Sequence, residues 1–265
     1  MAYLLHGTAF ITGAGSGIGA GVARTFSQNG ISKLALIDIN PSSLQKASES
    51  LRQRSPDVEL LTAAVDVTNE AHVDNAVQKA ATKFGRVDIG VNCAGVCDPK
   101  EPTDRLSLKD WQRTININQT GVWLSQRALI RQMLTQTSRD TRHGRGVIIN
   151  VCSSLGITAS ATGMPYPAYT SSKHASTSVV GLTKMDAKYY APSGIRMNAV
   201  CPGFVDTPMV SGAGNSGVFK KEVESAPVGR IANVEEITDS ILFLASPMSS
   251  FIYGAGLVVD GGYGL

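Results

Sequence analysis

A tyrosine and a lysine stand four residues apart, at Tyr169 and Lys173, in a segment whose pattern predicts a long helix. Positions i and i+4 lie on one helix face, so the lysine ammonium can stabilise the phenolate form of the tyrosine. A free tyrosine loses its proton only at about pH 10, and bringing that equilibrium to neutral pH takes roughly 4 kcal/mol. One fixed cation, helped by a second positive charge, can supply this and make Tyr169 a general acid or base. Taken alone, this spacing is also typical of solvated helix faces.

A glycine-rich turn supplies a second candidate site. The predicted strand 9–12 runs into this turn and then into a helix, with the sequence Thr12-Gly13-Ala14-Gly15-Ser16-Gly17-Ile18-Gly19. Glycines let the backbone approach a pyrophosphate, whose charge a helix N-terminus favours. Asp38 ends the second predicted strand, nineteen residues after Gly19, where a carboxylate can accept hydrogen bonds from ribose hydroxyls. It would repel a 2′-phosphate, and the following Ile39 and Asn40 offer no cation, so NAD(H) is favoured over NADP(H); the alternative is a solvated strand-end carboxylate.

Two further strand ends carry polar residues or glycine. They read Ala64-Val65-Asp66-Val67-Thr68 and Val91-Asn92-Cys93-Ala94-Gly95. Both are expected at the carboxyl edge of the sheet, where open α/β sheets bind ligands. There Asp66 can accept a hydrogen bond from an adenine amino group, and the backbone around Asn92 and Gly95 can border a cofactor. Each residue is equally compatible with a helix cap or a turn.

Seven short aliphatic runs, separated by stretches of helical length, must position these residues. Continuously apolar strands are typical of a parallel sheet that helices cover on both faces. The sequence therefore predicts an α/β fold with seven strands and about six crossover helices. The runs are residues 9–12, 34–37, 60–65, 89–92, 147–150, 197–200 and 256–259.

Composition narrows the possible functions. A chain of 265 residues with 43% apolar residues fits one α/β domain. The net charge is only +3 and the basic cluster 139–145 contains an acid, so nucleic-acid binding is not expected. No apolar run approaches the roughly 20 residues of a membrane span, which predicts a soluble, cytoplasmic protein. The four cysteines lack C-x₂-C spacing and the four histidines are scattered, so no metal site is expected.

Taken together, the motifs resemble the short-chain dehydrogenase/reductase family, and they span nearly the whole chain in family order. The matching segments are Thr12-Gly13-x-x-x-Gly17-x-Gly19, Asn92-Cys93-Ala94-Gly95, Trp111…Ile115-x-x-Asn118-x-x-Gly121, Ser153, Tyr169-x-x-x-Lys173 and Cys201-Pro202-Gly203-x-x-x-Thr207. The resemblance implies a single Rossmann-type, doubly wound domain over residues 1–265. It also implies a seven-stranded parallel sheet in the order 3-2-1-4-5-6-7.

The resemblance assigns roles by position. Tyr169 is the general acid/base, Lys173 holds the nicotinamide ribose, Ser153 hydrogen-bonds the reacting oxygen and Asn118 holds a water that links Lys173 to solvent. The oxidised nicotinamide is then the second positive charge. The residues expected to bind the cofactor are Gly13, Ser16, Gly17, Ile18, Gly19, Asp38, Asp66, Val67, Asn92, Gly95, Tyr169, Lys173, Val205 and Thr207.

Two assignments have neighbouring competitors. Counting from Trp111 to Gly121 aligns Asn118 with the family asparagine and leaves Asn116 as a helix-surface residue. Ser153 is in register with the family serine, but the adjacent Ser154 stays open as an alternative. Cys93 also stands where the family more commonly has a second asparagine.

The expected function is the NAD-dependent oxidation of a secondary alcohol, or the reduction of the matching ketone. The loop 159–168 and a Gly/Ser-rich lid at about 207–227 are expected to line the pocket. Their apolar residues indicate a moderately bulky terpenoid, steroid-like or polyketide substrate; they are Met164, Tyr166, Met209, Val210 and Phe219. The alternatives are an isomerase, dehydratase or enoyl reductase that uses the same Tyr/Lys pair, or a non-catalytic nicotinamide-binding sensor. A homodimer or homotetramer is also expected.

Overall fold

A computed structural model describes residues 4–156, 158, 163–211 and 217–265 of the chain. It contains a parallel sheet of seven strands in the order β3-β2-β1-β4-β5-β6-β7, which confirms the predicted topology. The seven predicted runs each fall on one strand. The strands are β1 (Thr8–Thr12), β2 (Lys33–Asp38), β3 (Glu59–Ala64), β4 (Ile89–Asn92), β5 (Gly146–Val151), β6 (Ile195–Pro202) and β7 (Gly256–Val259).

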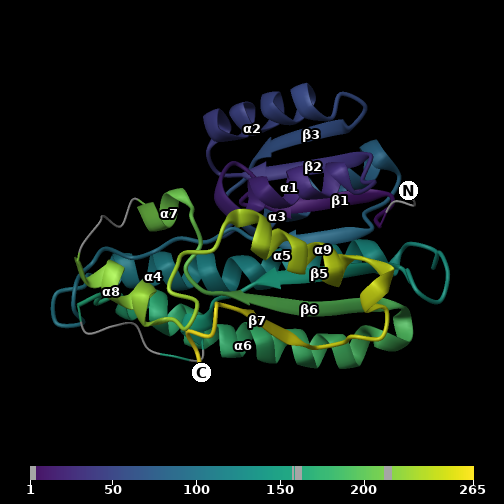
Figure 1. The fold of residues 1–265 in the computed structure, drawn as a ribbon. Coiled ribbons are helices and arrows are strands. Elements are labelled where there is room, and N and C mark those ends of the chain that lie inside the picture. Colours follow the sequence, from purple (N-terminus) through teal and green to yellow (C-terminus); the bar gives the residue numbers. More distant parts are fainter. Residues whose placement is uncertain (1–3, 157, 159–162, 212–216) are drawn as a thin grey trace.

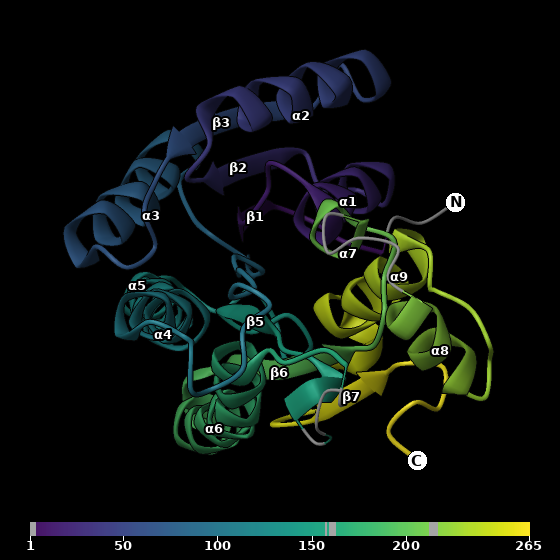
Figure 2. The ribbon, with the colours of Figure 1, turned by 90° about the vertical axis from the view of Figure 1, so that its left-hand side faces the viewer.

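Helices cover both faces of the sheet. On one face lie α1 (Gly17–Gln28), α2 (Pro41–Arg54) and α9 (Val234–Ala245), and on the other lie α3 (Glu70–Phe84), α5 (Gly121–Leu134) and α6 (Pro167–Tyr190) (Figure 2). Each face has its own apolar core, because the central strands alternate side chains between the two layers. The largest fully buried side chains include Phe10 of β1, Phe26 of α1 and Leu129 of α5.

The two edge strands differ from the expectation that all strands are buried on both faces. The central strands β1 and β4 are buried along their whole length, whereas β3 and β7 contain mostly exposed or half-buried residues. An edge strand has only one neighbouring strand, so less of its surface is covered. Apolar composition therefore predicted the strands but not their position in the sheet.

The helical segment that contains Asn116 and Asn118 is divided by a wider turn. It consists of α4 (Leu108–Ile115), a π-helical turn (Asn116–Thr120) and α5. A π turn inserts one extra residue and rotates the side chains that follow. As a result Asn118 is buried, with 3% of its surface exposed, while Asn116 is exposed.

Short helices α7 (Pro208–Ser211) and α8 (Gly217–Ser225) follow β6 and lie beyond the carboxyl ends of the strands, at the left of Figure 1. Beneath this edge, Asn92 of β4 donates to Asn150 of β5 at 2.8 Å, and Asn150 donates to Gln126 of α5 at 2.7 Å. All three side chains are almost completely buried. This polar network ties the central strands to a helix directly below the candidate site.

Candidate active site

The glycine-rich turn leaves room for a ligand beside the start of α1. Gly13 and Gly17 have φ angles of +67° and +51°, which side chains rarely adopt. A Cβ at Gly19 would lie 2.2 Å from the carbonyl oxygen of Gly13, so only glycine fits there. The side chain of Ser16, at the N-cap of α1, makes no capping hydrogen bond. The first N–H groups of α1 are therefore available to an anion such as a pyrophosphate.

Asp38 is fixed by the backbone on both sides of its carboxylate. One oxygen accepts a hydrogen bond from the N–H of Gly15 at 2.9 Å, and the other accepts from the N–H of Asn40 at 2.9 Å. A Cβ at Gly15 would lie 2.8 Å from the carboxylate, so this close approach requires glycine. Asp38 is thus oriented by the protein itself at the rim of the first cavity.

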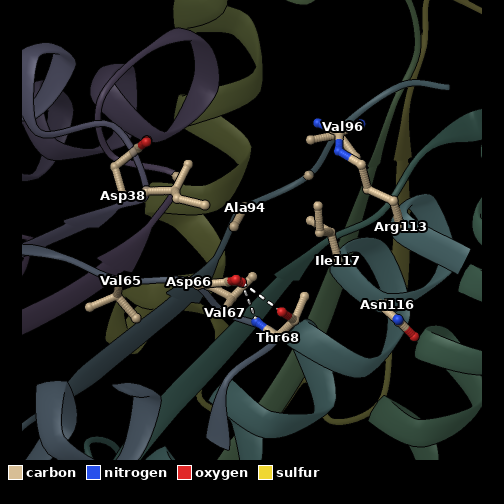
Figure 3. A pocket seen from close by; sticks show the side chains of 13 residues that line it. Asp38, Val65, Asp66, Val67, Thr68, Ala94, Val96, Arg113, Asn116 and Ile117 are labelled. Carbon is tan, nitrogen blue, oxygen red and sulfur yellow. Dashed lines mark hydrogen bonds between the residues drawn. The ribbon is translucent and has the colours of Figure 1, made fainter. Parts of the chain in front are cut away.

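This first cavity, of about 390 Å³, lies between the ends of β2, β3 and β4 and the start of the π turn (Figure 3). Figure 3 shows Asp38 on one side and Arg113 on the other, with Ile117 on the side of Arg113. Asp66 accepts hydrogen bonds from the N–H and hydroxyl of Thr68, at 2.9 and 2.7 Å, through one oxygen. The lining residues are Gly13, Asp38, Ile39, Val65, Asp66, Val67, Thr68, Ala94, Gly95, Val96, Arg113, Asn116 and Ile117.

A second cavity, of about 240 Å³, continues from the first and shares Gly13, Asp38 and Gly95 with it. It runs along the start of α1 toward α6. Its lining residues are Gly13, Ser16, Gly17, Ile18, Gly19, Asp38, Cys93, Gly95, Val151, Cys152, Tyr169, Lys173, Thr207, Pro208 and Met209. The two cavities together form an elongated site, and they contain all but four of the expected cofactor-binding and catalytic residues.

Those four are Val205, Asn92, Asn118 and Ser153. The side chain of Val205 is buried in the core, with 3% exposed, and only its backbone faces the neighbourhood of Thr207, whose hydroxyl donates to its carbonyl at 3.3 Å. Asn92 is buried in the network with Asn150, so it supports the site from below.

Tyr169 and Lys173 lie in the first turns of α6, as the sequence predicts. The Lys173 ammonium is 5.5 Å from the centroid of the Tyr169 ring, and it donates to the carbonyl oxygen of Cys152 at 3.4 Å. Only 7% of the surface of Lys173 is exposed. The lysine cation is thus held beside the tyrosine ring in a buried position.

Asn118 connects three segments around this pair. Its amide oxygen accepts from the N–H of Val96, and its amide nitrogen donates to the carbonyl of Val96, each at 2.9 Å. The same nitrogen donates to the hydroxyl of Ser172 at 2.9 Å. A Cβ at Gly95 would lie 3.3 Å from the Asn118 oxygen and 3.9 Å from the Lys173 nitrogen. The π turn therefore brings Asn118 beside Lys173, between the segment after β4 and α6.

Ser153 and Ser154 both line a third cavity of about 90 Å³, which also contains Tyr169. The hydroxyl of Ser153 accepts from the N–H of Leu155 at 3.2 Å, and Ser153 is 8% exposed. Ser154 is more deeply buried, at 2%. Tyr169 belongs to both the second and the third cavity, so it stands where the two meet.

The third cavity is lined by aliphatic, aromatic and sulfur-containing side chains together with two serines, and none of its described lining residues is charged. They are Cys97, Ser153, Ser154, Leu155, Met164, Tyr166, Tyr169, Gly203, Phe204, Met209 and Val210. Burial raises the pKa of the Cys97 thiol to about 12, so this thiol is neutral. Residues 159–162 and 212–216 of the expected substrate loops, and the side chain of Phe219, lie outside what the structure describes.

Several lining residues were missed by the sequence argument. Arg113 and Ile117 border the first cavity from the helix after the fourth strand, and Cys97, Leu155 and Phe204 border the third. No motif marked them, because their contribution depends on how the π turn and the loops after β4 and β6 are packed. The sequence offered one signal for a further functional residue at this edge. This is the charged Asp98, three residues after Gly95.

Parallel strands in this order, a glycine-rich turn before an uncapped helix and a carboxylate at the end of the second strand define a dinucleotide-binding α/β protein. Among the residues that the structure describes, no set of His, Cys, Asp and Glu side chains could hold a metal ion. Nor does any helix in the described ranges have the length and apolarity needed to cross a membrane.

Comparison with known proteins specifies the family. A family model described as enoyl-(acyl carrier protein) reductase matches residues 13–264. The short-chain dehydrogenase anuF of Penicillium roqueforti is 39% identical, covering 99% of this chain and 97% of its own. The cis-4-hydroxycyclohexanecarboxylate dehydrogenase of Sinomonas cyclohexanicum is 38% identical, with 96% and 95% covered. The structure of levodione reductase has a TM-score of 0.88 at 30% identity and covers 97% of both chains.

The chain therefore belongs to the short-chain dehydrogenase/reductase family. It is an oxidoreductase of a family that binds nicotinamide cofactors. The residues present fit such a cofactor, because Gly13, Gly17 and Gly19 line the second cavity and the N-cap side chain of α1 makes no capping hydrogen bond.

Proposed function

We propose that the protein is an NAD-dependent dehydrogenase that oxidises a secondary alcohol, or reduces the matching ketone, on an apolar and moderately bulky substrate. The observation that carries this proposal is the position of Tyr169. It lines both the elongated cofactor cavity and the apolar cavity beside it, next to a buried lysine. A side chain that exchanges a proton with the substrate must lie at such a junction.

When bound, the nicotinamide supplies or accepts a hydride. The chain's own residues handle the proton and the oxygen. In the oxidation direction the Tyr169 phenolate takes the proton from the alcohol, and in the reduction direction the Tyr169 hydroxyl donates its proton to the ketone oxygen. Lys173 stabilises the phenolate that is present before oxidation and after reduction. Ser153 donates a hydrogen bond to the substrate oxygen as its charge changes. Asn118 holds the segment around Gly95 against α6, the helix that carries both Tyr169 and Lys173.

Preference for NAD over NADP is supported at the rim of the first cavity. Asp38 presents a negative charge where a ribose 2′-position is expected, and it is already oriented by Gly15 and Asn40. The next residue, Ile39, is apolar and 67% exposed. The one cationic side chain among the described lining residues is Arg113, across the cavity from Asp38 (Figure 3). A 2′-phosphate beside Asp38 would therefore meet repulsion without a compensating cation.

An apolar substrate is supported by the third cavity, which presents aliphatic, aromatic and sulfur-containing side chains around Tyr169. A charged or heavily hydroxylated substrate would leave its polar groups without partners there. One relative, the cis-4-hydroxycyclohexanecarboxylate dehydrogenase, is named for a ring alcohol. We therefore favour an alicyclic secondary alcohol, with terpenoid, steroid-like and polyketide alcohols as the classes to try first.

The test is a panel of alicyclic secondary alcohols, with NAD or NADP, in which the absorbance of the reduced nicotinamide is followed and product masses are measured. We expect turnover with NAD and a ketone product two hydrogens lighter than the alcohol. Reduction of a C=C bond, loss of water or an isomer of unchanged mass would instead indicate the enoyl reductase, dehydratase or isomerase chemistry. Cofactor binding without turnover on any substrate would favour a sensor.

A further inference from the structure

Asp98 is a buried carboxylate at the start of the helix that carries Tyr169. It lies in the loop after β4, only 5% exposed, and is about seventy residues away along the chain. Its two oxygens accept hydrogen bonds from the backbone N–H groups of Ala168 at 3.1 Å and of Tyr169 at 2.8 Å. The second donor belongs to the proposed catalytic residue itself.

These bonds complete the first turn of α6, which has no local cap. Pro167 is the first residue of the helix and has no N–H, and Tyr166 at the N-cap makes no side-chain capping bond. The N–H of Thr170 reaches the carbonyl of Tyr166 at 2.8 Å. The N–H groups of Ala168 and Tyr169 are the ones left over, and Asp98 accepts both. By contrast, α2, α3 and α4 are capped by the residue directly before them, namely Asn40, Asn69 and Ser107.

The segment that carries Asp98 is itself fixed to the site. Val96 makes hydrogen bonds in both directions with the side chain of Asn118. Asn118 in turn donates to the hydroxyl of Ser172, and that hydroxyl donates to the carbonyl of Tyr169 at 2.7 Å. The first turn of α6 is therefore held at two points by residues 96–98, once at its N–H groups and once through Asn118.

The direction in which the pKa of the Asp98 carboxyl is shifted also indicates a role other than stabilising the fold. Burial raises the pKa of the Asp98 carboxyl, with a smaller contribution from the negative charge of Asp110, although the two N–H groups oppose this shift. A carboxyl whose pKa is raised on folding stabilises the folded state at low pH, and this contribution is lost as pH rises through the raised pKa. At neutral pH the ionised Asp98 is thus less favourable in the folded protein than an exposed carboxylate would be.

We propose that Asp98 is a positioning residue for the reaction: its carboxylate anchors the N–H of Tyr169 and so sets where the tyrosine hydroxyl meets the substrate. This inference rests on the proposed function of Tyr169. It predicts that loss of Asp98 lowers kcat without a matching loss of cofactor affinity, because most residues that line the cofactor cavities belong to segments other than α6 and residues 96–98.

The test compares Asp98→Ala and Asp98→Asn with the matched control Asp88→Asn. Asp88 is also a buried carboxylate, 8% exposed, that accepts a hydrogen bond from a backbone N–H, that of Thr8 at 3.0 Å, but it lies directly before β4, at the opposite edge of the sheet. We expect Asp98→Ala to lower kcat by about 100-fold, the cost of a misplacement of the order of 1 Å, with the Kd for NAD changed less than about threefold. Asp98→Asn keeps one acceptor oxygen, so its kcat should lie between that of Asp98→Ala and that of the unmodified protein.

Amide hydrogen exchange of residues 166–172 reads the same inference without turnover. Exchange at Ala168 and Tyr169 should rise by about tenfold or more in Asp98→Ala and stay unchanged in Asp88→Asn. If the unmodified protein has no turnover, the proposed function fails and this exchange alone decides the inference. A kcat for Asp98→Ala within about twofold of the unmodified enzyme, a kcat loss equal to that of Asp88→Asn, or unchanged exchange would each overturn it. Should Asp98→Ala not fold, Asp98→Asn is judged by the same outcomes.

Discussion

At the scale of single residues, the two ends of the cofactor site depend on side chains that the protein has already fixed. Asp38 accepts two backbone hydrogen bonds before any ligand is considered. Tyr169 is held through its own N–H and carbonyl groups by Asp98 and Ser172. A pre-oriented group loses little entropy when it meets its partner, so replacing either residue should have a large effect.

Replacing Asp38 should change the choice between the two nicotinamide cofactors. Asp38→Asn keeps an acceptor for the backbone but removes the charge that repels a 2′-phosphate. A hydrogen bond to a charged group contributes about 1.5–3 kcal/mol, so kcat/KM with NAD should fall roughly 10- to 100-fold. The kcat/KM with NADP should either rise or fall by much less than the kcat/KM with NAD. Steady-state kinetics with both cofactors measure the ratio, and Asp57→Asn on an exposed turn is the control for lost charge. An unchanged ratio would contradict the role of Asp38.

Ser153 and its neighbour Ser154 can be separated by a matched pair of substitutions. Removing a hydrogen-bond donor to a developing oxyanion costs about 10²- to 10³-fold in kcat. We expect that loss for Ser153→Ala. For Ser154→Ala we expect a loss of less than about fivefold, because its hydroxyl lies one position further along the turn after β5. Single-turnover rates with saturating NAD measure both. The reverse order would assign the role to Ser154.

At the scale of elements, the backbone of the turn between β1 and α1 is what admits the cofactor. In Gly19→Ala the new methyl group would lie 2.2 Å from the backbone oxygen of Gly13, which cannot move aside as a flexible side chain could. We expect NAD affinity to fall by more than about tenfold, together with a lower unfolding midpoint.

Calorimetric titration with NAD measures this loss, and Gly85→Ala is the control. Gly85 ends α3 with a φ of +86°, and a Cβ there would meet nothing within 4 Å. It should lower stability by about 1–2 kcal/mol through backbone strain and leave NAD affinity intact. Normal NAD affinity in Gly19→Ala would show that the turn does not approach the cofactor.

The sequence was sufficient for the elements but not for the details of their junctions. Continuous apolar runs predicted all seven strands, and the glycine turn with Asp38 predicted the cofactor edge. The π turn was not predictable, because it requires only that one extra residue be accommodated, and no residue type demands it. Nor was the bond from Asp98 to Tyr169, since a contact across some seventy positions depends on how two loops pack. Val205 is the opposite case. It lies beside Thr207, as the motif predicts, but its side chain is buried in the core.

At the scale of the whole molecule, α4, α5 and α6 carry large apolar side chains that a single chain leaves exposed. They include Trp111, Trp123, Met185 and Tyr189, with exposures between 37% and 67%. Apolar residues of this size on neighbouring helices are typical of an interface between subunits. We expect a homodimer or homotetramer.

Size-exclusion chromatography with light scattering tests this expectation. The unmodified protein should have two or four times the mass of its 27.9 kDa chain. Met185→Glu places a charge among these side chains, and burying an unpaired charge is costly, so this variant should shift toward the monomer. A monodisperse monomer of the unmodified protein would contradict the prediction.

The central claim is that Tyr169 exchanges the substrate proton beside a bound NAD, and Tyr169→Phe tests it most directly. This change removes one hydroxyl and keeps the ring beside Lys173. The decisive measurement is kcat on the best alcohol substrate together with the Kd for NAD. The account predicts that kcat falls by about 10²- to 10⁴-fold, the usual contribution of a general acid/base, while the Kd stays within about threefold. A variant that keeps most of its turnover would contradict it.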